Sequence, residues 1–110
     1  MATKHARRLL AGTVISADGI SRNMIISREQ DSRLTMSPFT HEIHSTAFVD
    51  CIAFVDTSRI TRAIIKEIER ISAEEDTPAV QSFLSAQGLL AAPGQGALLA
   101  VGTQSIIIEI

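Results

Sequence analysis

Aromatic residues are scarce in this sequence. It has no Trp, no Tyr and only four Phe among 110 residues, whereas Ile occurs fifteen times. The core must therefore be built from aliphatic, β-branched side chains rather than from large rings. Such side chains are stiff about their first torsion angle and pack well on pleated, half-buried surfaces. The composition favours a fold with a substantial β-sheet.

Cysteine is nearly absent as well. The single cysteine, Cys51, excludes an internal disulfide and is compatible with a reducing compartment. Hydrophobic residues make up 45% of the chain and charged residues 20%, which excludes disorder and supplies enough apolar surface for one core at this length. We therefore expect a single domain over residues 1–110, located in the cytoplasm.

Long apolar runs and a strong charge of either sign are also missing. No apolar run approaches the roughly 20 residues that a helix needs to cross a bilayer. The basic start of the chain resembles a secretory signal, but its apolar part, Leu9 to Ile15, is short and contains Gly12, which suits a strand better. The net charge is −2, and the basic segment KHARR lacks interleaved aromatic residues. We expect neither a membrane nor a nucleic acid as a partner.

The first part of the chain has the pattern of a β-hairpin. Asp18-Gly19 separates two β-rich runs, and a type I′ turn needs positive φ at both central positions, which Asp and Gly tolerate. We therefore expect a hairpin that pairs residues 8–17 with 20–29. A second turn and a short strand, 33–37, follow before the chain meets a proline.

Residues 43–55 predict the longest strand, and its two faces differ because side chains alternate along a strand. The first face is apolar or small throughout and suits the close packing of helices. It comprises Ile43, Ser45, Ala47, Val49, Cys51, Ala53 and Val55. The second face is mixed, so a site or a subunit contact is expected there. It comprises His44, Thr46, Phe48, Asp50, Ile52 and Phe54.

The period of the pattern then changes from strand to helix. A stripe of isoleucines indicates an amphipathic helix. The stripe comprises Ile60, Ile64, Ile68 and Ile71. Asp56 or Thr57 is expected to cap this helix by accepting from N–H groups of its first turn. Thr77 as N-cap and Pro78 at the first helical position predict a second helix, which Gly88 ends in a left-handed conformation.

The end of the chain, ALLAVGTQSIIIEI, returns to strand, with Gly102-Thr103 as a second hairpin turn. The predicted order of elements is therefore ββββααββ. Strands that precede the helices and are joined by hairpin turns are typical of an α+β fold. We expect an antiparallel or mixed sheet of about five to six strands with the two helices packed on one face.

Burial of its own side chains is not sufficient to stabilise the tail SIIIEI as a strand. On a strand, Ile106, Ile108 and Ile110 share one face. Burying three isoleucines contributes at most roughly 4–9 kcal/mol, while ordering the backbone costs ~1–2 kcal/mol for each residue. The tail is stable only if it also forms ladder hydrogen bonds and has a covered face. We expect it in the middle of the sheet, or at an edge that a second copy of the chain covers, and hence a homo-oligomer.

Three patterns resemble known kinds of site without matching them. The histidines of HEIH, His41 and His44, share a face on a helix but lie on opposite faces of a strand, so no metal site is expected. Cys51 points to the predicted core face, away from His44 and Asp50, and is expected to be a small buried hydrophobe rather than a nucleophile. APGQG lacks the glycine pattern of a dinucleotide loop and the lysine of a P-loop, so we interpret it as a turn and expect no cofactor.

Asp50 is the strongest candidate for a site residue among the polar residues. A carboxylate inside an apolar strand destabilises the fold unless it is paired. Arg22, Arg28 and Arg33, on neighbouring predicted strands, are its candidate partners. The alternatives are a strand face wet enough for an aspartate and a polar pocket built around it. His44 shares this face but lies six residues away, about 20 Å at the rise of a strand, so the two could act only with partners from other strands.

Two hypotheses of function follow from these patterns. The first is a small oligomeric binding or assembly module, of unknown ligand, that associates through its sheet and its C-terminal strand. The second is a small enzyme or small-molecule-binding protein with a polar site on the mixed strand face. The contacts in that site would be His44, Thr46, Asp50 and Arg22.

Overall fold

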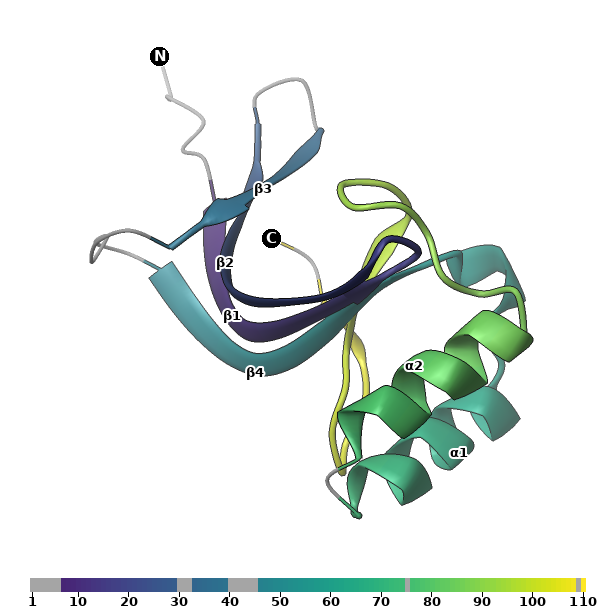
Figure 1. Cartoon of the computed structure of the whole chain (residues 1–110). Helices are drawn as coiled ribbons and strands as arrows, with labels where there is room; N and C mark the ends of the chain where they lie inside the picture. Colours follow the sequence, from purple (N-terminus) through teal and green to yellow (C-terminus); the bar gives the residue numbers. More distant parts are fainter. Residues whose placement is uncertain (1–6, 30–32, 40–45, 75, 109) are drawn as a thin grey trace.

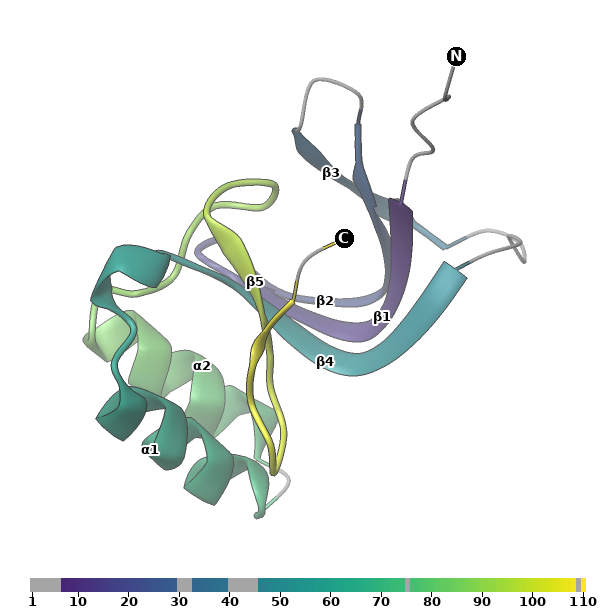
Figure 2. The ribbon, with the colours of Figure 1, turned by 180° about the vertical axis from the view of Figure 1, so that it is seen from behind.

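Six strands form one mixed sheet, and two helices pack against it (Figures 1 and 2). The computed structural model describes residues 7–29, 33–39, 46–74, 76–108 and 110. The elements are β1 (Arg7–Ser16), β2 (Gly19–Arg28), β3 (Leu34–Pro38), β4 (Thr46–Val55), the 3-10 turn η1 (Thr57–Arg59), α1 (Arg62–Ser72), α2 (Thr77–Ala86), β5 (Ala97–Ala100) and β6 (Ile107–Ile108). The predicted α+β fold with this order of strands and helices is confirmed.

The sheet has the strand order β3-β2-β1-β4-β5-β6. The pair β1–β4 is parallel, and the other neighbouring pairs are antiparallel. The long connection from β2 through β3 to β4 brings β4 alongside β1, with the two strands in the same direction. No helix within the described residues is long and apolar enough to cross a membrane.

The predicted hairpin of β1 and β2 is present, but its turn differs from the prediction. Ser16 pairs with Gly19, so Ala17 and Asp18 are the two loop residues. Positive φ occurs at Gly19 (124°) and at neither loop residue, so the turn is not the type I′ turn expected for Asp18-Gly19. The main-chain N–H of Asp18 instead donates to Ser16 Oγ at 3.2 Å, a local side-chain bond of the kind that stabilises tight turns.

The three long strands β1, β2 and β4 bend sharply together (Figures 1 and 2). In β4, Val49 and Ile52 pack into the same core, although strict alternation would place them on opposite faces. In β1, Ala11 and Val14 show the same shift. Each strand therefore places two consecutive residues on the outer side of the bend, although the pairing register continues through it without an inserted residue. After the bend, Ala53 and Val55 pack against the helices as predicted. Before the bend, the predicted faces of β4 are exchanged, since Val49 packs into the same core as Ile52.

Gly12 of β1 allows β1 and β4 to approach each other closely at the bend. A Cβ atom at Gly12 would lie 2.9 Å from the carbonyl oxygen of Asp50 in β4. On β2, Asn23 adopts a φ of 54°, a left-handed conformation that asparagine tolerates better than most residues. Residues with unusual backbone freedom therefore occupy the bend on two neighbouring strands, β1 and β2.

The bend separates two hydrophobic cores. The helix-side core lies between the sheet and the helices. It comprises Ile15, Ala53, Val55, Ile68, Ile71, Val80, Leu84, Leu89 and Leu99. The inner core lies on the concave side of the bent sheet. It comprises Leu9, Ala11, Val14, Ile26, Leu34, Ile52, Phe54 and Leu98. Ile52 and Phe54 are fully buried here, so the half of β4 after the bend has a core on each face.

Both predicted helices are present, with different capping residues. The isoleucine stripe of α1 is confirmed, since Ile68 and Ile71 are buried. Thr61 is the N-cap of α1 and accepts from Ile64 N at 3.2 Å, whereas Asp56 caps the preceding turn η1. The prediction of Asp56 or Thr57 as the cap of α1 is wrong because the chain first forms the 3-10 turn η1, and α1 begins only after it.

In α2 the N-cap is one residue earlier than predicted. Asp76 Oδ1 accepts from Ala79 N at 2.9 Å, and Thr77 is already helical. Gly88 follows the helix with a φ of 67°, the left-handed conformation that the sequence predicted.

The tail belongs to the sheet, at its edge rather than in its middle. β6 pairs only with β5 among the described strands, and a connection over residues 101–106 replaces the two-residue turn expected at Gly102-Thr103. Ile108 and Ile110 pack against the inner core, whereas the side chain of Ile106 is 64% exposed. The Arg28 guanidinium donates from Nε to the main-chain oxygen of Ile110 at 2.8 Å. The tail is thus fixed to the folded body while part of its apolar surface faces outward.

Candidate functional site

The outer side of the bend carries a polar hollow, which we name the corner hollow. Its volume is about 420 Å³. It lies where the bent strands meet the end of α1, the start of α2 and the connection after β5. The lining residues are Thr13, Asp50, Cys51, Ser72, Asp76, Thr77, Val80, Val101, Gly102 and Thr103.

The pairing register of β1, β2 and β4 determines which residues lie at the floor of the corner hollow. Thr13 of β1 pairs with Arg22 on β2 and with Cys51 on β4, so these three residues form one row across the sheet. Direct strand partners project to the same face. Asp50, next to Cys51, lines the same hollow because of the bend. The predicted separation of Asp50 and Cys51 onto opposite faces is therefore wrong.

The Cys51 thiol is held in its neutral form. Burial raises its pKa to about 11, and the negative charge of Asp50 acts in the same direction, while the positive charge of Arg22 opposes them. A thiolate is the reactive form of cysteine, so Cys51 is a poor nucleophile at neutral pH. Its side chain also packs at the margin of the helix-side core.

The helices contribute polar groups to the opposite wall. Asp76 caps α2 through one carboxylate oxygen. The hydroxyl of Ser72, at the end of α1, is buried and has no hydrogen-bond partner in the part of the chain that the structure describes. Within the same described part, no group of three or more His, Cys, Asp or Glu side chains could hold a metal ion.

Of the four predicted site residues, only Asp50 lines the corner hollow. Arg22 lies across β1 from Asp50, in the row of Thr13 and Cys51, and is not part of that lining. His44 lies outside the described residues. Thr46 begins β4 opposite Arg8, about 13 Å from Asp50 at the rise of a strand, and only its main chain is described.

The other candidate partners of Asp50 have different roles or positions. Arg28 reaches the tail instead, and Arg33 lies just before β3, which β2 and β1 separate from β4. Sequence reasoning missed Thr13, Asp76 and Thr103, because only the three-dimensional fold brings these distant segments to one place.

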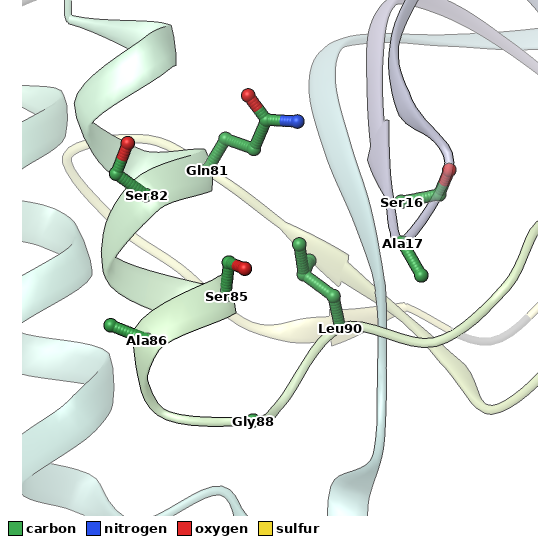
Figure 3. A pocket seen from close by; sticks show the side chains of 8 residues that line it. All are labelled: Ser16, Ala17, Gln81, Ser82, Ser85, Ala86, Gly88 and Leu90. Carbon is green, nitrogen blue, oxygen red and sulfur yellow. The ribbon is translucent and has the colours of Figure 1, made fainter.

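A second hollow lies between α2 and the β1–β2 turn (Figure 3). Its volume is about 600 Å³. In Figure 3 the side chains of Gln81 and Leu90 project toward the gap in front of Ser16 and Ala17. The full lining is Ser16, Ala17, Gln81, Ser82, Ser85, Ala86, Gly88 and Leu90. With no charged group in this lining, it offers only neutral hydroxyl and amide contacts.

Apolar side chains are exposed at the end of the sheet. On and beside β6, Ile106 is 64% exposed and Ile107 is 38% exposed. Phe48 of β4 is 61% exposed and lies near Gly12, at the bend. Exposed large apolar residues that lie together often mark a contact surface.

We compared the chain with protein-family models, with curated proteins and with solved structures, and none of them matches it.

Proposed function

We propose that this protein is a small self-associating binding module whose copies pair through β6. The observation that supports this proposal most directly is the combination of a fixed tail with exposed isoleucines. The tail is held by the bond from Arg28 to Ile110 and by the bond from Ser105 N to Glu69 Oε2 at 2.9 Å. Ile106 and Ile107 nevertheless remain on the surface.

The main chain of β6 defines how two copies would meet. Ala100 N donates to Ile106 O, so Ile106 directs its main-chain groups toward β5. Because successive residues of a strand direct these groups to opposite edges, the N–H and C=O of Ile107 face outward. A two-fold axis at Ile107 would let each copy donate one hydrogen bond to the other. This is an isologous contact, in which the same surface serves both subunits.

The energies of this contact predict weak association. The exposed fractions of Ile106 and Ile107 together amount to about one whole isoleucine, so burying them in both copies contributes about 3–6 kcal/mol. Two ladder hydrogen bonds add about 1–3 kcal/mol. The loss of translational and rotational freedom costs about 4–15 kcal/mol. The terms are of similar size, so we expect a dimer that forms at high micromolar concentration.

Sedimentation velocity over a range of concentrations tests this proposal. The wild-type chain should shift from monomer to dimer as its concentration rises. The double variant Ile106→Thr/Ile107→Thr keeps β-branched residues but loses apolar surface, and it should remain monomeric with an unchanged melting temperature. Gln104→Thr, an exposed change in the same segment, is the matched control and should dimerise normally. A wild-type chain that stays monomeric at high micromolar concentration would reject the proposal.

A further inference from the structure

The hollow between α2 and the β1–β2 turn has walls that are held in place by the fold. Ala17 N donates to Ala91 O at 2.9 Å, which joins the turn to the connection after α2. Ser16, beside it in the lining, is only 4% exposed. Leu90, also in the lining, forms a bridge with Val55 of β4. The hollow is therefore formed before a ligand arrives, which reduces the ordering that binding requires.

The wall formed by α2 carries hydrogen-bonding groups that the protein itself does not use. Gln81 and Ser85 are four residues apart, so they lie on one face of the helix. In Figure 3 the Gln81 carboxamide and the Ser85 hydroxyl both point toward the gap. Gln81 is half-buried, and neither side chain forms a hydrogen bond with any residue that the structure describes. Both groups can donate and accept, so both are available to a ligand.

The chemistry of the lining decides which class of ligand fits. None of the described lining residues carries a charge, so an ionic group buried here would lose water without gaining a charged partner. Hydroxyl groups match a carboxamide and a serine well, since all of them can donate and accept. A peptide strand would need apolar pockets for its alternate side chains, and Leu90 is the only large apolar residue among the described lining.

We propose that this hollow binds an uncharged monosaccharide unit. One hydroxyl of the pyranose ring accepts from the Gln81 carboxamide nitrogen, its neighbour donates to the carboxamide oxygen, and a third bonds to Ser85. The C–H face of the ring packs on Leu90 and Ala17. The volume of about 600 Å³ is within the range of small-molecule sites, about 300–1,000 Å³. No residue of β6 lines the hollow, so the site does not depend on the proposed self-association.

Titration of the full chain with the methyl glycosides of glucose, galactose and mannose, followed by backbone amide NMR spectra, tests the proposal. At least one glycoside should shift the amide signals of Ala17, Gln81 and Gly88 in a saturable manner at millimolar concentration. Cyclohexanol has a ring of similar size but a single hydroxyl. It should bind at least ~fivefold more weakly, because it loses two or more of the hydrogen bonds.

A charged sugar tests the neutral character of the site. Methyl β-D-glucuronide carries a carboxylate in place of the hydroxymethyl group of methyl β-D-glucoside. It should bind no more tightly than the glucoside, because the described lining offers the carboxylate no cation.

Variants with matched controls assign the contacts. Gln81→Leu loses the carboxamide at similar volume and should weaken binding of the best glycoside at least ~fivefold. Gln87→Leu, at the exposed C-cap of α2 and outside the lining, should bind normally. Ser85→Ala should weaken binding at least ~twofold, whereas Ser37→Ala on the exposed end of β3 should not. The Ile106→Thr/Ile107→Thr variant should bind as the wild type does, so failure of self-association and failure of glycoside binding are separate results.

Four outcomes would overturn the proposal. The first is the absence of saturable shifts with all three glycosides. The second is equal binding of cyclohexanol, which would mean that apolar contact alone accounts for the shifts. The third is tighter binding of the glucuronide, and the fourth is unchanged binding by Gln81→Leu. If Gln81→Leu does not fold, the comparison of ligands on the wild-type chain still decides the outcome.

Discussion

Replacing Gly12 by alanine tests whether this residue holds the bend in place. A Cβ atom there would lie 2.9 Å from the carbonyl oxygen of Asp50. That oxygen belongs to the main chain of β4. On either side of it, β4 is paired to β1 through Ala11 with Val49 and Thr13 with Cys51. The oxygen therefore cannot move aside as the end of a flexible side chain would, and relief of the contact requires the two strands to separate.

The expected cost follows from the effect of overpacking. Forcing an additional methyl group into a closely packed place costs about 1–3 kcal/mol. Alanine also reduces the freedom of the unfolded chain, which by itself stabilises a protein by about 0.4–1 kcal/mol. A glycine without a close neighbour is needed to separate the two effects. At Gly102 the nearest atom to an added Cβ is 3.8 Å away, an ordinary contact.

Urea unfolding of Gly12→Ala and Gly102→Ala gives the comparison. Gly12→Ala should be less stable than Gly102→Ala by about 1–3 kcal/mol, with a melting temperature lower by about 4–12 °C. The dependence of unfolding free energy on urea should be the same for both, because the folded surface is unchanged. If the two variants are equally stable within about 0.5 kcal/mol, the strands can yield at this point and Gly12 does not determine the bend.

Three further predictions concern Cys51 and the start of α1. Burial raises the pKa of the Cys51 thiol from 9.0 to about 11, so between these pH values the thiol is protonated in the folded protein and deprotonated in the unfolded chain. The free energy of unfolding should therefore fall as pH rises from 9 to 11. A Cys51→Ala variant should lose this part of the pH dependence. Alkylation of Cys51 by iodoacetamide at pH 8 should be much slower in the folded chain than in urea, and equal rates would contradict its neutral, partly buried state. Thr61→Ala should lower the free energy of unfolding by about 1 kcal/mol in urea titrations, because Ile64 N loses its hydrogen-bond acceptor. Thr61→Ser keeps a hydroxyl at this position and should retain most of the stability. Equal losses of stability in the two variants would exclude capping as the cause.

The elements of the fold were predictable where a short stretch of sequence determines them. The pairing of β1 with β2 as a hairpin, the isoleucine stripe of α1 and the left-handed Gly88 each depend on residues that are neighbours in sequence. The cap of α2 was missed by one residue, because both Asp76 and Thr77 can accept hydrogen bonds from a first turn. Small errors of this kind arise when adjacent residues have the same chemistry.

The candidate site was predictable only in part. The isolated carboxylate of Asp50 in an apolar strand drew attention to β4, and Asp50 and Cys51 of this strand line the corner hollow. The parallel pairing of β1 with β4, which places Thr13 beside Cys51, depends on contacts between distant segments. Periodicity within 43–55 also gave the wrong neighbours for Asp50, because alternation is interrupted at the bend.

The bend and the corner hollow depend on each other through the register of the sheet. Thr13 pairs with Cys51 after the bend and Ala11 pairs with Val49 before it, so β1 and β4 keep the same offset throughout. Neither strand slips along the other, and both must shift their side chains at the same place. A change that straightened β1 alone would break its pairing with β4 on one side or turn Thr13 away from the hollow. The regular alternation that was expected for β4 is therefore incompatible with a site that contains both Asp50 and Cys51.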